Sequence, residues 1–405
     1  MATCNVCASD VEEFAALLNL PIYCNLLWDS KQAAIDCPKG DIRLAFCGNC
    51  GAISNTAFDP SKLGYSQDYE NSLHYSPRFQ DYATTLANRL VEKHDLHGKT
   101  IIEIGCGKGD FLVSLCELGK NTGVGFDNSY VERDEYDALG EQVTFVQDFY
   151  SAKYADYQGD FVCCRQVLEH IQNPNDLLLP LKGALKDKSS QEKSVAFFEV
   201  PNALYTFKNM MVWDIIYEHC TYFTPVSLRY VFTMAGYVAE AVKEEFGGQF
   251  ISLEAHLADT TIRSSSERAD NSYASVDVSS LSKDIDAFES QFCAQLRQWI
   301  AELDKLFSAG QKVVIWGSGS KGVTFLNLLN LSDKIKYAVD INPRKQGKFI
   351  PGSGQEIVSP ELMKTYRPDV VIVMNPLYEE EIQAALQEMG LSARVTTTEM
   401  FGLEA

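Results

Sequence analysis

The segment that most constrains the fold is an apolar run followed at once by alternating glycines and then by a helical pattern. The run Ile101–Ile104 precedes Gly105, Gly107 and Gly109, and a helix is expected to open at Asp110. Glycines at this point let the backbone approach a ligand closely, and a helix N-terminus presents unpaired N–H groups. The pattern therefore predicts a strand, turn and helix start that bind a ligand.

Carboxylates follow the ends of the neighbouring predicted strands. Glu103 stands at the end of the first strand, where it can meet an amino-bearing ligand. Asp127 ends the next strand, where an acid accepts hydrogen bonds from both ribose hydroxyls. Asp148 follows the strand at 143–147 and is suited to an adenine amino group. Together these residues predict a nucleoside site, and an α/β turn that binds nothing is the alternative.

Apolar runs alternate with amphipathic stretches from about residue 60 to residue 260, which predicts a doubly wound α/β sheet with crossover helices. A polar segment at 259–280 and a helical pattern at 281–306 then lead into a second, smaller α/β unit. The predicted strands are Thr100–Ile104, Gly123–Phe126, Val143–Val146, Phe161–Cys164 and Val195–Val200 in the first unit, and Val313–Trp316, Ile335–Val339 and Val370–Met374 in the second.

The charge balance and the absence of long apolar stretches exclude several classes of partner. Lys and Arg total 35 against 55 Asp and Glu, a formal charge of -20, which would repel an extended nucleic acid. No stretch approaches the roughly 20 apolar residues of a membrane helix. Cys4 and Cys7 stand where a signal peptide would have its basic start. A cytoplasmic protein with a small-molecule substrate is expected.

Four of the 12 cysteines form two tight pairs near the N-terminus, Cys4-x-x-Cys7 and Cys47-x-x-Cys50. Two pairs of thiolates on tight turns can form a closed tetrahedral zinc site. A redox role is disfavoured because neither pair lies at a strand-to-helix junction of a thioredoxin-like unit. Little hydrophobic periodicity accompanies the pairs, so a small domain held by structural zinc is predicted.

A concentrated set of polar side chains follows the fifth predicted strand, in the segment Tyr217-Glu218-His219-Cys220-Thr221-Tyr222. A histidine beside a carboxylate can serve as a general base at neutral pH, and tyrosines can donate to developing oxyanions. A helix is expected to start at Thr224-Pro225. The segment before it should be a loop at the carboxyl edge of the sheet, where open α/β folds bind ligands. In the alternative, His219 pairs with Glu218 only to hold the loop.

The order of the glycines, Glu103, Asp127 and Asp148 resembles class I S-adenosylmethionine-dependent methyltransferases, and most of the chain resembles the sugar C-methyltransferases of deoxysugar biosynthesis. This resemblance implies a zinc-binding domain at 1–60, a methyltransferase domain at 61–280 and a Rossmann-like α/β domain at 281–405. It rests on the cysteine pairs, the glycine segment, Leu168-Glu169-His170, Glu199-Val200-Pro201, Glu218-His219 with Tyr222-Phe223, Gly247-Gly248-Gln249, Gly317-Ser318-Gly319-Ser320-Lys321-Gly322, 339–348, Pro351-Gly352 and Ile357-Val358-Ser359-Pro360.

The resemblance also implies roles for the residues. The family methylates carbon 3 of a nucleotide-linked 4-keto-hexose, so His219 would be the base and Glu218 would orient it. Tyr217 or Tyr222 would hold the carbonyl oxygen or the sugar. Two tyrosines upstream, Tyr65 and Tyr69, lie where the family closes a lid over cofactor and sugar, although an aromatic-rich loop of this kind is as often part of a small core.

The chain departs from the family pattern at the His219 segment. The family usually has Ile-Tyr-His-Glu-His, whereas this chain has Ile216-Tyr217-Glu218-His219, one residue fewer. Ile216 therefore aligns with the family's catalytic tyrosine, for which Tyr217 is the candidate replacement. A methyltransferase acting on oxygen, nitrogen or carbon of a non-sugar metabolite is the first alternative.

Two further alternatives concern nucleotide binding. The strand and glycines at 313–322 with the later Asp340 are consistent with a nicotinamide-dependent oxidoreductase. The glycine spacing is unusual for such a site, and Lys321 suits a phosphate or pyrophosphate instead. A nucleotide-binding protein without catalytic activity is the last alternative.

Overall fold

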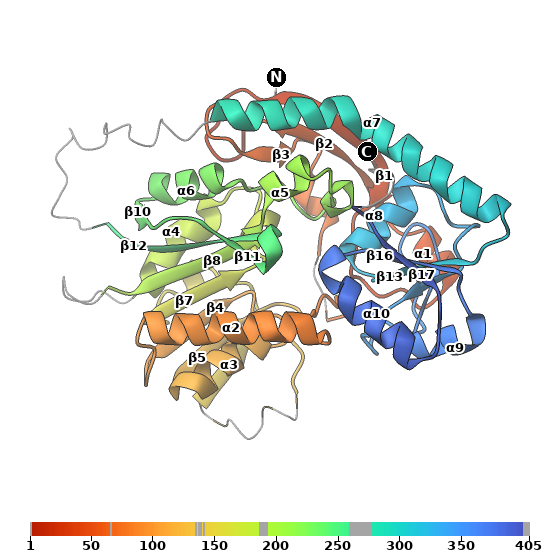
Figure 1. The fold of residues 1–405 in the computed structure, drawn as a ribbon. Coiled ribbons are helices and arrows are strands. Elements are labelled where there is room, and N and C mark those ends of the chain that lie inside the picture. Colours follow the sequence, from red (N-terminus) through yellow and green to blue (C-terminus); the bar gives the residue numbers. More distant parts are fainter. Residues whose placement is uncertain are drawn as a thin grey trace.

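The computed structural model describes residues 2–64, 67–133, 136, 140, 142–185, 193–258 and 278–399. Three β-sheets organise these residues, and Figure 1 shows the central sheet beside the C-terminal sheet, with the N-terminal strands above and between them. Tyr65, one of the two predicted lid tyrosines, lies outside the described residues.

The central sheet has the strand order β10-β12-β8-β7-β4-β5-β6, and β11 pairs with β12. Its five parallel members confirm the predicted strands, with ends that differ by a single residue at most: β4 (Thr100–Ile104), β5 (Thr122–Phe126), β6 (Val143–Val146), β7 (Phe161–Arg165) and β8 (Val195–Pro201). The antiparallel strands are β10 (Tyr237–Ala239), β11 (Lys243–Glu245) and β12 (Phe250–Leu257).

Helices cover both faces of the central sheet. Ile101, Phe161 and Phe197 pack with one apolar cluster that includes α2 and α3, whereas the next residue of each strand packs with a cluster that includes α4 and α6. Burial on both faces explains why the strands are nearly continuous apolar runs. The helices are α2 (Pro77–Lys93), α3 (Asp110–Gly119), α4 (Asn175–Ala184), α5 (Ala203–Lys208) and α6 (Pro225–Met234).

The N-terminal sheet corrects the expectation of a small domain with little core. It has the order β1-β2-β3-β9, and its apolar side chains belong to one large cluster that also contains residues of α7 and of the C-terminal unit. Residues far apart in sequence supply this core, so local periodicity did not reveal it. The elements are β1 (Glu12–Pro21), α1 (Lys31–Ile35), β2 (Lys39–Phe46), β3 (Ile53–Asn55) and β9 (Thr221–Tyr222).

The C-terminal sheet is parallel, with the order β15-β14-β13-β16-β17, and confirms a second α/β unit. The helix α7 (Val278–Ser308) covers the predicted helical stretch and extends along the N-terminal sheet toward this unit (Figure 1). The remaining elements are β13 (Val313–Trp316), α8 (Ser320–Leu328), β14 (Tyr337–Val339), β15 (Glu356–Val358), α9 (Met363–Tyr366), β16 (Val370–Val373), α10 (Glu379–Glu388) and β17 (Arg394–Thr397).

Short 3₁₀ helices connect many of these elements. One of them, the three-residue η4, ends at His170. They are η1 (Pro60–Lys62), η3 (Ala152–Tyr154), η4 (Leu168–His170), η5 (Val212–Asp214), η6 (Phe246–Gly248), η9 (Pro360–Leu362) and η10 (Pro376–Tyr378).

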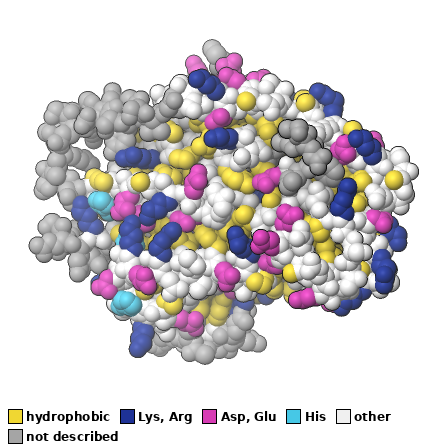
Figure 2. Space-filling view, viewed as in Figure 1, with side chains coloured by type: hydrophobic (Ala, Val, Ile, Leu, Met, Phe, Trp, Pro, Cys, Tyr) yellow, Lys and Arg dark blue, Asp and Glu magenta, His cyan; other side chains and the backbone are white. Residues whose placement is uncertain are grey.

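The face drawn in Figure 2 carries charges of both signs. On the face drawn in Figure 2, Lys and Arg side chains alternate with Asp and Glu, so no broad basic area faces the viewer. Within the described part of the chain, every helix is too short or too polar to cross a bilayer.

Candidate active site

The glycine turn lies between β4 and α3, and its three glycines have backbone angles of the left-handed region. A side chain at Gly105 would lie 2.1 Å from a methyl carbon of Val167, and one at Gly109 would lie 2.6 Å from the ring of Phe145. Gly107 also has a positive φ, but a side-chain atom there would meet nothing within 4 Å. The backbone at Gly107 is therefore the part of the turn that is open to a ligand.

The carboxylate of Asp127 fixes this turn to the end of β5. Its Oδ2 accepts a hydrogen bond from the N–H of Gly107 at 2.8 Å, and its Oδ1 accepts two from Ser129, from the backbone N–H and the hydroxyl, both at 2.7 Å. Since a carboxylate has about four lone-pair positions and three are used, Asp127 retains capacity for about one further hydrogen bond, from a ribose hydroxyl. The geometry fits a nucleoside at this edge.

The other two predicted cofactor-binding carboxylates differ in their surroundings. Glu103 is buried, its Oε2 has no hydrogen-bond partner among the described residues, and burial raises its pKa to about 7. Asp148 is largely exposed and accepts hydrogen bonds from Tyr154, Lys153 and the N–H of Phe149, which hold its pKa below the usual range. Among the described residues, its Oδ1 accepts one hydrogen bond and its Oδ2 accepts two, so Asp148 retains capacity to accept one from an adenine amino group.

His219 lies beside His170, in a loop that crosses the carboxyl edge of the central sheet. The two imidazole rings meet edge to face with centroids 4.9 Å apart. Burial, the neighbouring His170 and the charge of Lys321 hold the pKa of His219 well below its usual value, and burial lowers that of His170 to about 4. Both rings are therefore neutral at pH 7, and the lowered pKa values make them weaker bases than an exposed imidazole.

Glu218 points away from His219 and toward the N-terminal half of the chain. Its carboxylate accepts hydrogen bonds from the hydroxyl of Tyr69 at 2.6 Å and from the N–H of Cys24 at 2.9 Å. Burial raises the pKa of Glu218 to about 7 despite these bonds. Its backbone carbonyl accepts a hydrogen bond from Nδ1 of His170 at 2.9 Å. Glu218 therefore connects the two histidines through its main chain.

Tyr217 and Tyr222 use their hydroxyls for structural contacts. Tyr217 stacks on Phe58, and its oxygen accepts a hydrogen bond from the N–H of Asp59 at 3.0 Å. Tyr222 accepts a hydrogen bond from the N–H of Ile216 at 3.0 Å and donates one to the carbonyl of the same residue at 2.9 Å. Tyr222 touches His219 through its ring, with centroids 5.7 Å apart.

The predicted substrate residue Lys321, near the start of α8, forms an ion pair with Asp214 at the end of η5. Both side chains are mostly buried, with 15% and 19% exposed. This contact ties the C-terminal unit to the segment that precedes Glu218 and His219. The ammonium group of Lys321 would have to leave Asp214, or share it, in order to bind a phosphate.

Three residues at this site had no predicted role. Glu169 comes from the turn after β7 and is buried beside His170; Asp214 pairs with Lys321; Cys24 binds Glu218 through its N–H. For Glu169, the sequence offers one signal: a carboxylate that follows shortly after an apolar strand, in Cys164-Arg165-Gln166-Val167-Leu168-Glu169. The contacts of the other two are too distant in sequence to leave a local pattern.

The four N-terminal cysteines meet as a cluster. Cys4 and Cys50 have sulfurs 3.6 Å apart, those of Cys7 and Cys47 are 3.4 Å apart, and all four lie within 4.8 Å of one another. Four bonds of 2.3 Å to a tetrahedral zinc require sulfur separations of about 3.8 Å. The sulfur positions and the thiolate chemistry therefore fit a closed zinc site.

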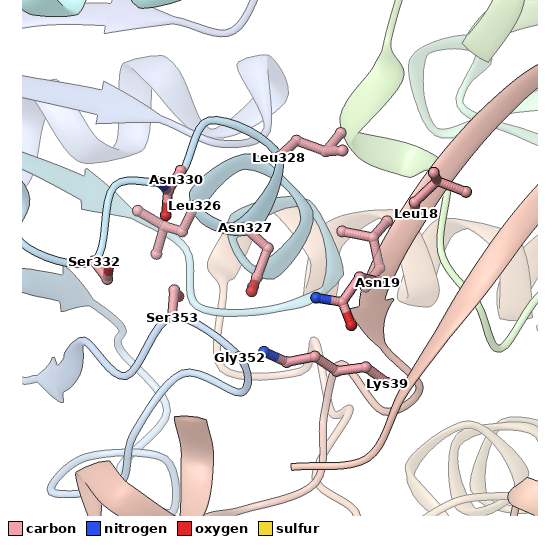
Figure 3. A pocket seen from close by; sticks show the side chains of 11 residues that line it. Leu18, Asn19, Lys39, Leu326, Asn327, Leu328, Asn330, Ser332, Gly352 and Ser353 are labelled. Carbon is pink, nitrogen blue, oxygen red and sulfur yellow. The ribbon is translucent and has the colours of Figure 1, made fainter. Parts of the chain in front are cut away.

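Two cavities lie near the junctions of the units. One of about 620 Å³ is bordered by Lys108 and Asp110 of the glycine turn region, by His74 and Tyr75, and by Arg344. The other, of about 230 Å³, lies between β1, α8 and the turn at Gly352, and Figure 3 shows its polar side chains. Only the first adjoins the candidate nucleoside site.

Two family models match successive parts of the chain. Residues 74–242 match a methyltransferase domain, and residues 247–393 match the C-methyltransferase C-terminal domain. The C-methyltransferase NovU of Streptomyces niveus is 25% identical over 224 residues, which are 54% of this chain and 51% of that protein. A mitochondrial ubiquinone biosynthesis O-methyltransferase of Dictyostelium discoideum is 28% identical over 123 residues, 25% of this chain and 38% of that protein. The chain thus spans about half or less of the length of these relatives.

Among solved structures, the chain is similar to the magnesium protoporphyrin IX methyltransferase ChlM of Synechocystis, determined with S-adenosylhomocysteine. The TM-score is 0.35 and the identity 17%, over 45% of this chain and 84% of that one.

The central sheet and the match over residues 74–242 show the mixed α/β sheet of a class I S-adenosylmethionine-dependent methyltransferase domain. This confirms the fold class expected from the glycine segment. The match over residues 247–393 and the similarity to NovU support a C-methyltransferase family.

Proposed function

We propose that this protein methylates a carbon atom of a nucleotide-linked keto-deoxysugar. The observation that carries the proposal is the position of His219. Its neutral, half-buried ring lies at the carboxyl edge of the methyltransferase sheet, while the adjacent segment is held by a C-terminal unit that matches a C-methyltransferase domain. Such a unit is expected where an acceptor substrate has to be enclosed together with the cofactor.

The proposed cofactor, S-adenosylmethionine, supplies an electrophilic methyl group when it is bound. The turn proposed to bind the cofactor is shaped by Gly105, Gly107 and Gly109, and their left-handed backbone angles support this role. Asp127 is proposed to bind the ribose. Glu103, with a buried and unpartnered oxygen, is suited to an amino group, and Asp148 to the adenine.

The proposed chemistry begins with removal of the proton on carbon 3 of the sugar, which the neighbouring ketone acidifies. His219 is the proposed base, and its neutral imidazole supports this role. Glu218 is proposed as a positioning residue, because its side chain holds the loop against Tyr69 and Cys24. The carbon nucleophile that forms then attacks the methyl group, for which the two substrates must be closely oriented.

The tyrosines receive revised roles in this proposal. The hydroxyls of Tyr217 and Tyr222 are engaged by main-chain groups, so both residues are proposed to position the loop and not to bind the keto oxygen. Tyr69 acts through Glu218. Lys321 is proposed to bind the phosphates of the substrate in place of its ion pair with Asp214.

Structural zinc is proposed at Cys4, Cys7, Cys47 and Cys50. The protein is proposed to act in the cytoplasm on small molecules, without a nucleic acid or membrane partner, in accord with its net charge of -20.

The test is incubation with S-adenosylmethionine carrying a labelled methyl group and a panel of nucleotide-linked 4-keto-deoxysugars. The proposal predicts label on a sugar carbon, located by mass spectrometry and carbon NMR. Matched sugars that are reduced at carbon 4 serve as the control, because without the ketone the proton on carbon 3 is not acidic. Label in none of the keto sugars would reject the proposal.

Methyl transfer to a hydroxyl is a second candidate, favoured by the similarity of part of the methyltransferase domain to ubiquinone biosynthesis O-methyltransferases. In the same assay, label on an oxygen of any acceptor, with no label on carbon, would favour it.

A further inference from the structure

The candidate cofactor site follows the order of the strands at the carboxyl edge of the central sheet. Asp148 follows β6, Asp127 follows β5 and Glu103 lies near the end of β4, and these strands are neighbours in that order. The same order of adenine, ribose and amino group occurs along the proposed cofactor. The carboxylate of the methionine part stands on the carbon that bears the amino group, so it should bind beside Glu103. On the side away from β5, the neighbour of β4 is β7.

Arg165, the last residue of β7, lies beside Glu103. The register pairs Glu103 with Cys163, and Arg165 follows two residues later, so its side chain projects from the same face of the sheet. Spacings of about 4.8 Å between strands and about 3.3 Å per residue place the two Cα atoms about 8 Å apart. Burial raises the pKa of Glu103, and the charge of Arg165 is the main influence in the opposite direction.

The guanidinium group of Arg165 lies against the first turn of α3. Its central carbon is 4.1 Å from the centre of the ring of Phe111, the second residue of that helix. Val167, two residues after Arg165, fills the position that a side chain at Gly105 would occupy. The end of β7 therefore lies next to the glycine turn, and Arg165 borders the same end of the candidate cofactor site as Glu103.

Several N–H donors of this guanidinium group have no hydrogen-bond partner among the described residues. Nε donates a hydrogen bond to Oε1 of Glu199 at 3.1 Å, and Nη2 lies 3.0 Å from the same oxygen. The remaining donors, both on Nη1 and one on Nη2, are unpaired in this part of the chain. The carboxylate of Glu199 is also shared with Tyr82 and Gln166. The side chain of Arg165 is 9% exposed, so a largely buried cation keeps donors for a ligand.

Two other cations near the glycine turn are engaged on its opposite side. Nζ of Lys108 donates a hydrogen bond to the carbonyl oxygen of Ser129 at 2.7 Å, and Arg133 forms an ion pair with Asp110 at 2.8 Å. Both contacts involve the segment that follows β5, where the ribose is proposed to bind. Of these three described cations, Arg165 is the one on the side of β7.

We propose that Arg165 binds the carboxylate of the methionine part of S-adenosylmethionine, next to the amino group held by Glu103. A guanidinium group and a carboxylate can form two parallel hydrogen bonds, which are stronger than those between neutral groups. Contacts with both charged groups on one carbon fix the direction of the methionine chain. Arg165 is thus a cofactor-binding residue that orients the methyl group toward the acceptor.

The inference rests on the proposed function for the identity of the cofactor, and not for the acceptor. S-Adenosylhomocysteine is the appropriate probe, because it keeps the amino and carboxylate groups and has no methyl group to transfer. Its affinity is compared by calorimetry with that of its decarboxylated analogue, which keeps the amino group. The parent protein should bind S-adenosylhomocysteine at least about tenfold more tightly than the analogue, as expected for hydrogen bonds to a charged group.

Arg165→Gln should reduce this preference to about twofold or less, because only the ligand with the carboxylate loses a contact. A purely structural role of Arg165 predicts equal weakening of both ligands and an unchanged preference. Arg165→Lys keeps a positive charge beside Glu199, which protects the fold. Its preference should be intermediate, since an ammonium group cannot form the two parallel bonds.

The matched control is Arg89→Gln, since Arg89 also pairs with a largely buried carboxylate, that of Glu245 in β11. This variant should keep the full preference, and circular dichroism verifies the fold of each variant. Equal affinity of the parent protein for both ligands, or the full preference in folded Arg165→Gln, would overturn the assignment. If Arg165→Gln does not fold, an undiminished preference in Arg165→Lys has the same meaning.

The binding result is independent of the sugar assay, because no acceptor is present. A carboxylate preference that depends on Arg165, together with an unlabelled sugar panel, would leave the role of Arg165 standing and reject the sugar substrate. Binding of S-adenosylhomocysteine without that preference would reject only the role of Arg165. Absence of S-adenosylhomocysteine binding would reject the proposed cofactor and this role together.

Discussion

Gly40, in β2, provides the sharpest test of how the N-terminal sheet supports the active-site loop. A side-chain carbon at this position would lie 2.4 Å from Cε2 of Tyr217, 2.9 Å from Cδ2 and 3.0 Å from Cζ. The ring of Tyr217 is completely buried, stacks on Phe58 and is fixed through its hydroxyl to Asp59. Gly40→Ala therefore forces the ring, or β2, to move by about 1 Å to regain ordinary contact distances.

The expected cost follows from two opposing effects. Overpacking of a core by one methyl group typically costs about 1–3 kcal/mol. Alanine restricts the unfolded chain more than glycine does, which returns about 0.4–1 kcal/mol where the backbone is compatible. Gly40 has no positive φ, so this compensation applies. The net loss should be about 1–2 kcal/mol.

Native-state hydrogen exchange of the amides in β2 and β3 is the suitable assay, because a chain with three sheets does not guarantee two-state unfolding. In the background of Tyr217→Leu, which removes the ring, Gly40→Ala should cost at least about 1 kcal/mol less than it does alone. Tyr217→Phe keeps the ring and should give no such relief. Additive effects of Gly40→Ala and Tyr217→Leu, or no cost of Gly40→Ala alone, would refute the packing argument.

Four further predictions follow from single contacts. His219→Ala should abolish methyl transfer and leave S-adenosylmethionine affinity within a few-fold, as measured by calorimetry; residual turnover near the parent rate would show that His219 is dispensable. Asp127→Ala should weaken cofactor binding, because it removes the proposed ribose acceptor and frees the Gly107 turn, and an unchanged dissociation constant would contradict this. Cys47→Ser should lower the bound zinc, measured by atomic absorption, and increase proteolysis of the N-terminal sheet; full zinc content would reject the assignment. Burial alone would raise the pKa of Glu254, but hydrogen bonds from His94 and Lys93 outweigh it and lower the pKa to about 2. Its stabilisation, about 3 kcal/mol, is therefore present above the unfolded pKa and lost as the pH falls from about 5 to 2, so the stability of Glu254→Gln should approach that of the parent protein over this window; a constant difference in chemical denaturation would contradict it.

The sequence predicts the five parallel strands of the central sheet well because most of their residues are apolar and buried. Thr100–Ile104 and Val143–Val146 are strands with the predicted ends, and the helix start at Thr224 is confirmed by a capping box with Ser227. In these segments the signal is local. The N-terminal sheet gives a weaker pattern, since several positions of β1 are exposed and the residues that cover it come from α7, more than 200 positions later.

In the candidate site too, the sequence reveals features that depend on neighbouring residues and not those that depend on distant contacts. His219 is apparent because polar residues are concentrated around it. The orientation of its neighbours is not apparent from the sequence, because that orientation depends on β9. This strand of two residues joins the N-terminal sheet by pairing with β3. Next to this pairing, Tyr217 contacts Asp59 and Glu218 contacts Cys24, both of which lie far away in the sequence.

The loop that carries His219 is therefore assembled by all three units. The N-terminal unit holds Glu218 through Cys24, the methyltransferase unit holds its carbonyl through His170, and the C-terminal unit holds Asp214 through Lys321. A change in any one contact alters the distance between His219 and the glycine turn, on which an in-line transfer depends steeply. We therefore propose that the two outer units contribute to the proposed reaction by positioning this loop. Their exchange for those of a relative should succeed only when the contacts of Glu218 and Asp214 are transferred with them.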